Sequence, residues 1–262
     1  MELPINSFKQ GLRAGTAQIG LWLGPADPSA AELVATAGFD WLLIDVEHSP
    51  NDLRTVLAQL RAIAAYPSHP IMRPSSGSAE VIKQYLDLGV QTLLVPMVET
   101  PDEAARIVAA TRYPVRGIRG VASATTRASR WGQIDGYFER CEGELCVLVQ
   151  VESVRGLDNL QAIATVDGID GVFFGPADLA ASMGLIGAPT DPQVTRAIIQ
   201  GIAVVQKVGK AAGTLTSDFE LARKYLAHGA RFVAVGIDTV LLRQGASDLA
   251  AMFRQGVQPQ SR

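Results

Sequence analysis

Cysteine and histidine are scarce in this chain, which has two cysteines and three histidines among 262 residues. Two cysteines are too few for a disulfide framework. Cys146 also opens an apolar run, where a small buried thiol is the expected role. We therefore expect Cys141 and Cys146 to be free thiols, as is usual in a reducing compartment.

The chain also lacks an excess of positive charge and a long apolar run, and we expect no leader segment. Its formal net charge is -3, which argues against a nucleic-acid partner because few counterions would be released on binding. No apolar run approaches the ~18 residues that a membrane helix needs. The N-terminus has no charged segment followed by an apolar one, so no signal peptide is visible. We expect a cytoplasmic protein that binds neither nucleic acid nor membrane.

What the sequence does contain is a repeated alternation of short apolar strands and helical segments. Continuous apolar runs, rather than alternating ones, indicate strands that are buried on both faces of a parallel sheet. Helix-start signals separate them, the strongest being the capping box Thr100 to Glu103 with Pro101 at the first helical position. Eight strands are predicted, at 18–23, 41–44, 70–73, 92–96, 146–151, 171–174, 210–215 and 231–235.

Eight such units in this length predict an α/β fold of the (β/α)8 TIM-barrel type, as a single domain over residues 1–262. An open doubly wound sheet is the alternative. That fold would normally show a glycine-rich nucleotide turn after an early strand, and neither such a turn nor a P-loop is present. The stretch 113–143 has no clean period and is expected to be an irregular insertion. The polar tail from Gln255 is expected to fray.

Polar residues follow several of the predicted strands at their carboxyl ends, where TIM barrels place their functional groups. A polar group after a buried apolar strand needs a reason to be there. The residues in question are Asp45, Glu47, His48, Arg73, Gln150, Glu152 and Asp178.

Glu152 and Asp178 are the natural pair of metal ligands among them. Carboxylates from neighbouring strands, with no cysteine and little histidine nearby, suit a hard divalent ion such as Mg2+ or Mn2+. The alternative is that each carboxylate caps the helix that follows it, and the irregular entry at 175–177 leaves this open for Asp178.

His48 is a general acid/base candidate because it alone among the histidines follows a strand. Asp45 could orient its imidazole and raise its basicity. The alternative is a histidine that caps backbone groups in the turn before Pro50. His69 precedes a strand and His228 lies at a helix C-terminus, so both are expected to be structural.

Arg73 follows an apolar strand, a costly place for a charge that has no anionic partner. A substrate oxyanion would suit it, and a structural pair with Asp45 or Glu47 is the alternative.

Trp22 at the end of the first strand either lines the site or belongs to the core. Four insertion arginines either meet a distant acidic group of a substrate or are solvated: Arg116, Arg119, Arg127 and Arg130.

Several motifs together resemble a known family over nearly the whole chain, from about residue 20 to 249. They include Ile-Asp-Val-Glu-His-Ser-Pro-Asn (44–51), Gly-Ile-Arg-Gly (117–120), Arg-Ala-Ser-Arg-Trp (127–131), Val-Leu-Val-Gln-Val-Glu (147–152) and Gly-Pro-Ala-Asp-Leu-Ala (175–180). The chain is similar to the metal-dependent class II pyruvate aldolases of the 4-hydroxy-2-oxo-heptane-1,7-dioate aldolase family.

The resemblance implies a TIM barrel that assembles as a homo-oligomer, a hexamer built as a trimer of dimers that exchange the C-terminal helix. It implies a divalent ion (Mg2+, Mn2+ or Co2+) held by Glu152 and Asp178. The pyruvate carboxylate would meet backbone N–H groups near Gly175, Ala177 and Asp178.

The resemblance also assigns the remaining site residues. Arg73 would hold the keto oxygen, with Gln150 beside the substrate. His48, oriented by Asp45, would take the proton of the C4 hydroxyl through a water molecule on the metal. The metal and the guanidinium would stabilise the developing enolate. No lysine follows a strand, which agrees with a mechanism without a Schiff base.

The implied reaction is reversible cleavage of a 4-hydroxy-2-oxo acid to pyruvate and an aldehyde. The first choice of substrate is 4-hydroxy-2-oxoheptanedioate, which gives succinic semialdehyde. A 2-keto-3-deoxy sugar acid is the alternative, as is a non-catalytic barrel that only binds a keto acid. The segments 76–79, 121–126 and 214–217 depart from the family pattern. They leave the recognition of the aldehyde half open. Glu47 has no assigned role beyond supporting Asp45 and His48 or the water molecules on the metal.

Overall fold

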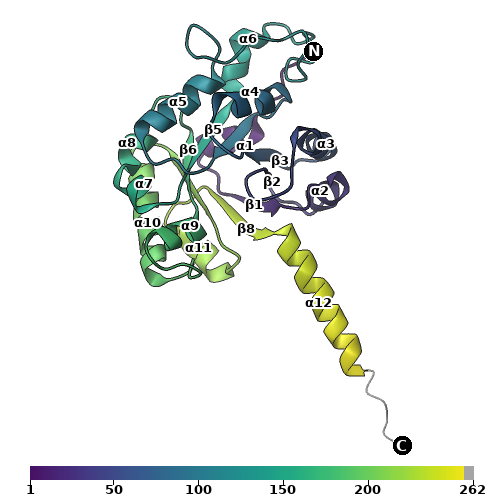
Figure 1. Ribbon diagram of the computed structural model, residues 1–262, viewed down its shortest axis with the longest axis vertical. Helices are drawn as coiled ribbons and strands as arrows, with labels where there is room; N and C mark the ends of the chain where they lie inside the picture. The colour runs from purple at the N-terminus through teal and green to yellow at the C-terminus, as the bar shows by residue number, and fades with distance from the viewer. Residues whose placement is uncertain (257–262) are drawn as a thin grey trace, which may run out of the picture.

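A computed structural model describes residues 1–256, and eight parallel strands in it close into a barrel in the order β1 to β8 (Figure 1). The predicted (β/α)8 TIM barrel is therefore confirmed. The strands are β1 Gln18–Leu23, β2 Trp41–Asp45, β3 His69–Arg73, β4 Thr92–Val95, β5 Cys146–Val151, β6 Gly171–Phe174, β7 Ala211–Leu215 and β8 Phe232–Ile237.

The helices surround the barrel and begin where the sequence signals them, with Asp27, Asp52, Thr100 and Asp218 as N-caps. The helix expected after β5 is divided in two, α7 and α8. The helices that follow strands are α2 Pro28–Ala35, α3 Leu53–Ile63, α4 Ala79–Asp87, α5 Pro101–Thr111, α7 Val154–Asp158, α8 Leu160–Ala164, α9 Pro176–Ser182, α10 Pro192–Lys207, α11 Phe219–Ala227 and α12 Asp238–Gly256.

The barrel interior is packed with side chains and contains several aromatic rings. Trp22, Trp41, Phe173 and Phe232 form one continuous cluster, with ring centroids 5.5 to 6.3 Å apart. A Cβ atom on Gly20 would overlap the Trp41 ring. Glycine at this strand position therefore lets a large ring fill the barrel. A larger apolar layer lies between the strands and the surrounding helices.

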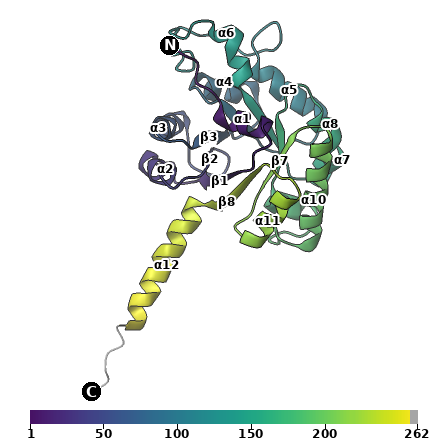
Figure 2. The same cartoon turned by 180° about the vertical axis from the view of Figure 1, so that it is seen from behind.

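Helix α1 (Ser7–Arg13) was not predicted, and it covers the N-terminal end of the barrel (Figure 2). Asn6 caps it and also donates to the Thr92 hydroxyl at 2.9 Å. Phe8 is fully buried, with its ring centroid 6.1 Å from that of Trp41 and 6.0 Å from the His69 ring. The helix thus closes the end of the barrel that lies opposite the expected site.

The structure confirms the structural role of His69. Its Nε2 shares a 2.9 Å hydrogen bond with the hydroxyl of Thr92. Burial lowers the pKa of His69 to about 4, so the ring is neutral at physiological pH. His228 ends α11 and its Nδ1 lies 2.8 Å from the Lys224 carbonyl oxygen, also as expected for a structural histidine. Cys141 and Cys146 are buried free thiols, as predicted.

The insertion 113–143 is irregular, as predicted, and holds helix α6 (Tyr137–Arg140) and the start of a 3-10 turn at Cys141–Glu144. It packs through buried polar contacts. Arg119 is almost fully buried, pairs with Asp87 at 2.8 Å and lies 4.6 Å above the Tyr113 ring. Arg127 donates to the Leu88 carbonyl oxygen at 2.7 Å. Both arginines therefore attach the insertion to the C-terminal part of α4 and the turn after it.

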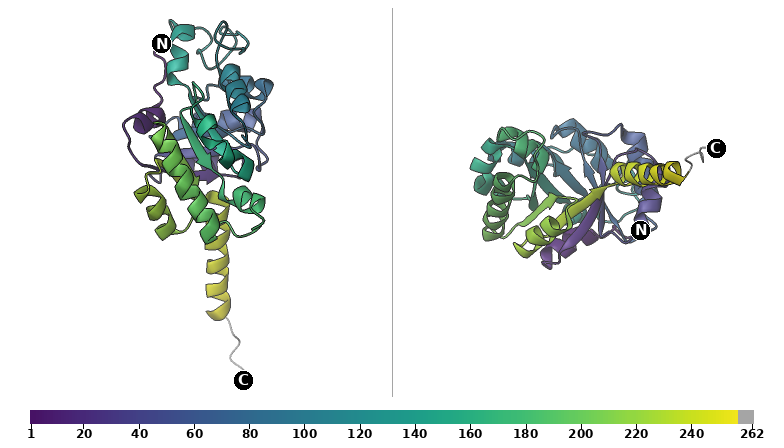
Figure 3. Two further views of the ribbon diagram at one scale, coloured as in Figure 1. Left: turned by 90° about the vertical axis from the view of Figure 1, so that its left-hand side faces the viewer. Right: turned by 90° about the horizontal axis from the view of Figure 1, so that it is seen from below.

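Helix α12 is the one long element that leaves the barrel, and it projects away from it (Figures 1 and 3). It reaches Gly256, and the tail expected to fray lies otherwise outside the described residues. Its apolar side chains are exposed, among them Leu242 at 72% and Phe253 at 66%. Among residues 1–256, no helix combines the length and the apolar character needed to cross a membrane.

Candidate active site

The carboxyl ends of the strands surround a cavity of about 510 Å³, and most of the predicted site residues line it. Parallel pairing places Asp45 of β2 directly beside Arg73 of β3. β5 and β6 are also neighbours in the barrel, so Gln150 and the turn after β6 face the same space. The lining residues predicted from the sequence are Trp22, Asp45, His48, Arg73, Gln150, Gly175, Ala177 and Asp178.

Arg73 is fixed by two carboxylates from the neighbouring strand end. Its Nε and Nη2 donate to the two oxygens of Asp45 at 2.9 and 2.8 Å. Its Nη1 lies 2.9 Å from Glu47 Oε2, an ion pair without the alignment of a hydrogen bond. Burial opposes its charge, but Asp45 and Glu47 outweigh this and raise the pKa of Arg73. The structural pairing considered from the sequence is therefore present.

The remaining donors of Arg73 still have access to the cavity. A guanidinium carries five N–H groups, and two of these are used in the hydrogen bonds to Asp45. The guanidinium carbon lies 5.4 Å from the centre of the Trp22 ring. Trp22 thus belongs both to the barrel core and to the wall of the cavity. Arg73 can therefore present N–H groups to a ligand oxyanion while its plane is held in place.

The expected partner of His48 requires a correction. Asp45 was expected to orient the imidazole, but both of its oxygens accept from Arg73. The carboxylate near the ring belongs to Glu47, whose Oε2 lies 3.8 Å from His48 Nε2. His48 itself lines the cavity with a side chain that is 66% exposed. The turn after β2 thus gives Glu47 a position between Arg73 and His48.

Glu152 is buried at the end of β5, with 3% of its surface exposed. One oxygen accepts from the Met97 backbone N–H at 2.9 Å, and the other accepts from the side chain of Gln150. Burial, with smaller contributions from Asp178 and Glu47, outweighs these hydrogen bonds and raises the pKa of Glu152 to about 7. Burial likewise raises the pKa of Glu47. Burial therefore disfavours the charged forms of Glu152 and Glu47 in this site.

This arrangement fits a divalent cation. A Cβ atom on Gly175 would clash with the Oε2 atom of Glu152, so the glycine leaves open the space in front of that oxygen. The Oε2 atom of Glu47 and the Oε1 atom of Gln150 are buried without a hydrogen bond. Buried oxygens of this kind are the ligands and neighbours that hard cations prefer. The described residues contain no cluster of three or more His, Cys, Asp or Glu side chains placed to hold a metal, so solvent or substrate would have to complete the coordination.

Asp178 lies in the first turn of α9, at the point where β6 leads into the cavity. No side chain caps this helix, whose N-cap is Gly175. Pro176 has no N–H group, and the first N–H groups of a helix have no intrahelical partner. The backbone N–H groups of Ala177 and Asp178 are therefore suited to a ligand carboxylate.

Some residues in and around the cavity were missed by the sequence interpretation. Met97 follows β4 and has a φ of 56°, in the left-handed region, and its N–H group binds Glu152. Leu215, Ile237 and Thr239 line the cavity at the ends of β7 and β8. Their positions at or just after the ends of predicted strands were the sequence feature that could have identified them. Their side chains carry no catalytic group, so they did not stand out.

The insertion arginines do not line this cavity in the part of the chain that the structure describes. Arg116 pairs with Glu142 at 3.1 Å and lines a different cavity. Arg119 and Arg127 are occupied by Asp87 and the Leu88 carbonyl oxygen. Within one subunit, these residues are therefore not placed to meet a substrate.

Comparison with known proteins identifies the family. The model of the HpcH/HpaI aldolase/citrate lyase family matches residues 18–245. A hydroxypyruvate/pyruvate aldolase from Deinococcus radiodurans is 60% identical over 249 residues, which are 95% of this chain and 90% of that protein. A 4-hydroxy-2-oxo-heptane-1,7-dioate aldolase from Salmonella dublin is 57% identical over 248 residues, which are 95% and 94%.

A solved structure agrees with this result. The crystal structure of an HpcH/HpaI aldolase/citrate lyase family protein from Burkholderia cenocepacia superposes with a TM-score of 0.91 at 42% identity, covering 95% of this chain and 99% of that one. The carbon–carbon lyase class expected from the sequence is confirmed. This chain belongs to the HpcH/HpaI aldolase/citrate lyase family.

Proposed function

We propose that the chain catalyses the metal-dependent, reversible aldol cleavage of a 4-hydroxy-2-oxo acid to pyruvate and an aldehyde. The observation that carries the proposal is that the fixed guanidinium of Arg73 and the accessible imidazole of His48 line one cavity. The buried carboxylate of Glu152 lies directly behind two of its lining residues, Gln150 and Gly175. The names of the relatives support the same reaction type.

Glu152 and Asp178 would hold the divalent ion, with Mg2+, Mn2+ and Co2+ as candidates. When bound, the ion supplies Lewis-acid stabilisation of negative charge on the keto oxygen. Other residues of the chain orient the Glu152 carboxylate and keep the space for the ion open. Gln150 and the Met97 N–H orient the Glu152 carboxylate, and Gly175 keeps the approach to it free of side-chain atoms.

Arg73 would stabilise the enolate oxygen that develops as the carbon–carbon bond breaks. A guanidinium held beforehand in a partly buried site needs no reorganisation at the moment of reaction, which is where electrostatic catalysis gains most. Asp45 and Glu47 provide that positioning. The N–H groups of Ala177 and Asp178 would bind the carboxylate of pyruvate, and Gln150 would lie beside it.

His48 would accept the proton of the C4 hydroxyl during cleavage and return it during synthesis. Its exposure in the cavity allows a substrate hydroxyl or a water molecule to reach it. Glu47, at 3.8 Å, is the group placed to stabilise the imidazolium that results. This replaces the role first given to Asp45, which becomes a positioning residue for Arg73.

Our first choice of substrate is 4-hydroxy-2-oxoheptanedioate, which would release succinic semialdehyde. Arg73 is the only lysine or arginine among the described residues that line the cavity. A distal carboxylate would therefore lie toward the open rim, where solvent or another subunit can meet it. A 2-keto-3-deoxy sugar acid is the alternative, and the neutral rim of Leu215, Ile237 and Thr239 does not discriminate against it.

Hydroxypyruvate is a second candidate as the nucleophilic substrate, in place of pyruvate. It is favoured by the relative of 60% identity, which is named a hydroxypyruvate/pyruvate aldolase. The extra hydroxyl lies on the carbon that becomes nucleophilic, so the same carboxylate and keto contacts would serve both acids.

The experiment is an assay of pyruvate release from a panel of 4-hydroxy-2-oxo acids, with and without EDTA, read as kcat/KM. We expect cleavage that EDTA abolishes and an added divalent ion restores. Cleavage that persists after complete chelation would reject the metal mechanism. A failure to cleave any member with any of the three metals would favour a barrel that only binds keto acids.

We also propose an oligomeric state and a cellular compartment for the chain. The exposed apolar side chains of α12 need a partner surface, and exchange of this helix between two copies of the chain would provide one. A hexamer formed as a trimer of dimers is the assembly that we propose. The two buried free thiols are consistent with a reducing cytoplasm.

A further inference from the structure

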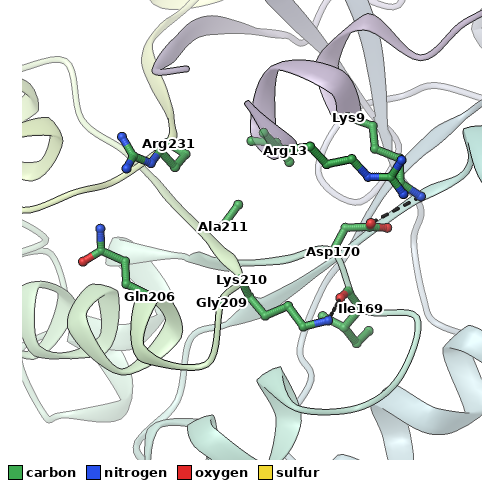
Figure 4. A pocket seen from close by; sticks show the side chains of 10 residues that line it. Lys9, Arg13, Ile169, Asp170, Gln206, Gly209, Lys210, Ala211 and Arg231 are labelled. Atoms are coloured by element: carbon green, nitrogen blue, oxygen red, sulfur yellow. Dashed lines mark hydrogen bonds and ion pairs between the residues drawn. The ribbon is translucent and has the colours of Figure 1, made fainter. Parts of the chain in front are cut away.

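A second cavity, also of about 510 Å³, lies at the opposite end of the barrel from the catalytic one. It is bounded by α1, by the residues that precede β6 and by the starts of β7 and β8. Figure 4 shows Lys9 and Arg13 of α1 on one side and Gln206 and Arg231 on the other, with Ala211 between them. None of the described residues lines both this cavity and the catalytic one.

Positive charge predominates in its walls, although the chain as a whole has a formal net charge of -3. Four basic side chains line it, from Lys9, Arg13, Lys210 and Arg231, and Asp170 is the one carboxylate among the lining residues. Like charges gathered around one cavity repel each other. An anionic ligand would relieve that repulsion.

The existing contacts leave two arginines available. Asp170 is already engaged, with one oxygen 3.3 Å from Lys9 Nζ and the other accepting from the Val147 N–H at 2.9 Å. Lys210 Nζ donates to the Ile169 carbonyl oxygen at 2.6 Å. Neither Arg13 nor Arg231 has a carboxylate within 4.0 Å among residues 1–256.

A neighbouring cavity of about 440 Å³ provides an internal comparison. It shares Lys9, Arg13 and Lys210 with the second cavity, but the arginines that line it alone do have acidic partners. Arg112 pairs with Glu142 and Asp167, each at 2.9 Å, and Arg116 pairs with Glu142 at 3.1 Å. Basic residues at this end of the molecule are therefore not left without carboxylates in general. Among the described arginines that line these two cavities, Arg13 and Arg231 are the ones without a carboxylate within 4.0 Å.

The guanidinium groups of Arg13 and Arg231 point away from each other on opposite sides of the cavity (Figure 4). We propose that this cavity binds a small polyvalent oxyanion, toward which Arg13 on α1 and Arg231 before β8 turn their side chains. Guanidinium groups present planar forks that match phosphate and carboxylate oxygens. The volume lies within the range of roughly 300 to 1,000 Å³ that small-molecule sites occupy. Because one arginine is on α1 and the other on the barrel, the bound anion would tie the N-terminal helix to the barrel.

The test is calorimetric titration of the EDTA-treated protein at constant ionic strength with chloride as the balancing ion. Pyrophosphate is the phosphate probe and tricarballylate is the carboxylate probe, so the two arms separate the two sources of oxyanion. We expect saturable binding of at least one probe with one site per chain. We also expect a rise in Tm that depends on its concentration, because a ligand that binds only the folded state stabilises it.

Variants decide where the probe binds. Arg13→Gln/Arg231→Gln should weaken binding by about tenfold or more, the usual consequence of losing charge-assisted hydrogen bonds, and should abolish the Tm rise. Arg116→Gln is the matched control and should bind as the parent does. Arg73→Lys tests the catalytic cavity and should also leave binding unchanged.

Three results would overturn the proposal. They are the absence of saturable binding for both probes, unchanged affinity in the double variant, and loss of binding in Arg73→Lys with retention in the double variant. The last result would place the anion in the catalytic cavity. Circular dichroism of each variant confirms that the protein remains folded.

Discussion

Arg73 illustrates how single residues are organised in this site. It is buried, pairs with Asp45 and Glu47, lies over Trp22 and still lines the cavity. Asp45 therefore fixes the plane of the Arg73 guanidinium, whereas Glu47 lies between Arg73 and His48. The sequence predicted that these residues would meet because all of them follow strands. It named a pair of Arg73 with Asp45 or Glu47 only as an alternative, because the choice of partner depends on side-chain rotamers in the turn after β2.

At the residue scale, the proposed roles of His48 and Arg73 can be separated by comparing two reactions. Aldol cleavage and decarboxylation of oxaloacetate produce the same pyruvate enolate, but only cleavage requires a proton to leave a hydroxyl. We expect His48→Ala to lower kcat for cleavage by about 10²-fold or more, the usual scale of general-base catalysis, while decarboxylation is largely retained. Arg73→Lys should impair both reactions. Equal losses of both in His48→Ala would contradict the assignment.

Gly175 offers a steric test of the metal site. Its φ of -83° suits any residue, but a Cβ atom there would clash with Glu152 Oε2 and would lie 2.9 Å from Gln150 Nε2. We expect Gly175→Ala to weaken metal binding and to lower kcat/KM by about 10²-fold, since small misplacements of positioning groups have effects of that size. Gly143→Ala, which meets no atom within 4 Å, is the control. Parental metal affinity in Gly175→Ala would exclude the proposed location.

At the scale of elements, the two ends of the barrel differ: one carries the candidate site and the other is covered by α1. The carboxyl ends of β2, β3, β5 and β6 position the groups to which we assign catalysis, whereas α1 closes the other end by packing Phe8 against His69. The strands could be predicted because continuous apolar runs and caps are local signals. α1 could not, because a helix of seven residues shows only Phe8 and Leu12 as a helical repeat. Its stability depends on packing against the barrel.

The buried His69 predicts a pH dependence of stability. Its pKa is about 4 when folded and near 6.5 when unfolded, so between these values the unfolded state binds the extra proton. The free energy of unfolding should therefore fall as pH drops from 6.5 toward 4, by up to roughly 3 kcal/mol from this group.

Urea unfolding at several pH values measures the effect. His69→Gln removes the titrating ring and should flatten the dependence in this window. The exposed His228 provides the control, because His228→Gln should retain the parental slope. An unchanged slope in His69→Gln would show that other groups dominate.

At the scale of the whole molecule, the barrel is self-contained but α12 is not. Leu241, Leu242 and Phe253 are more than half exposed on a helix that leaves the barrel. The helix also begins at the site, because Asp238 accepts from the Gly24 N–H at 3.0 Å and Gly24 lines the catalytic cavity. The start of α12 is therefore attached to the wall of the candidate site.

We expect Leu242→Glu/Phe253→Glu to dissociate the assembly, because a charge in an apolar interface remains without a partner. Light scattering after gel filtration gives the mass directly. Gln244→Glu, on the same helix, is the control for added charge and should leave the mass unchanged. A parental mass for the double variant would mean that these side chains do not hold the subunits together.

The central claim is that Glu152 and Asp178 hold the divalent ion on which cleavage depends. The most direct measurement is Mn2+ binding to the EDTA-treated protein by electron paramagnetic resonance, for the parent, Glu152→Gln, Asp178→Asn and the control Asp167→Asn, an exposed carboxylate elsewhere on the molecule. We predict one site per chain in the parent and the control, and affinity reduced by about 10²-fold or more in the other two, the scale associated with loss of groups at a metal site. Parental affinity in both Glu152→Gln and Asp178→Asn would contradict the account.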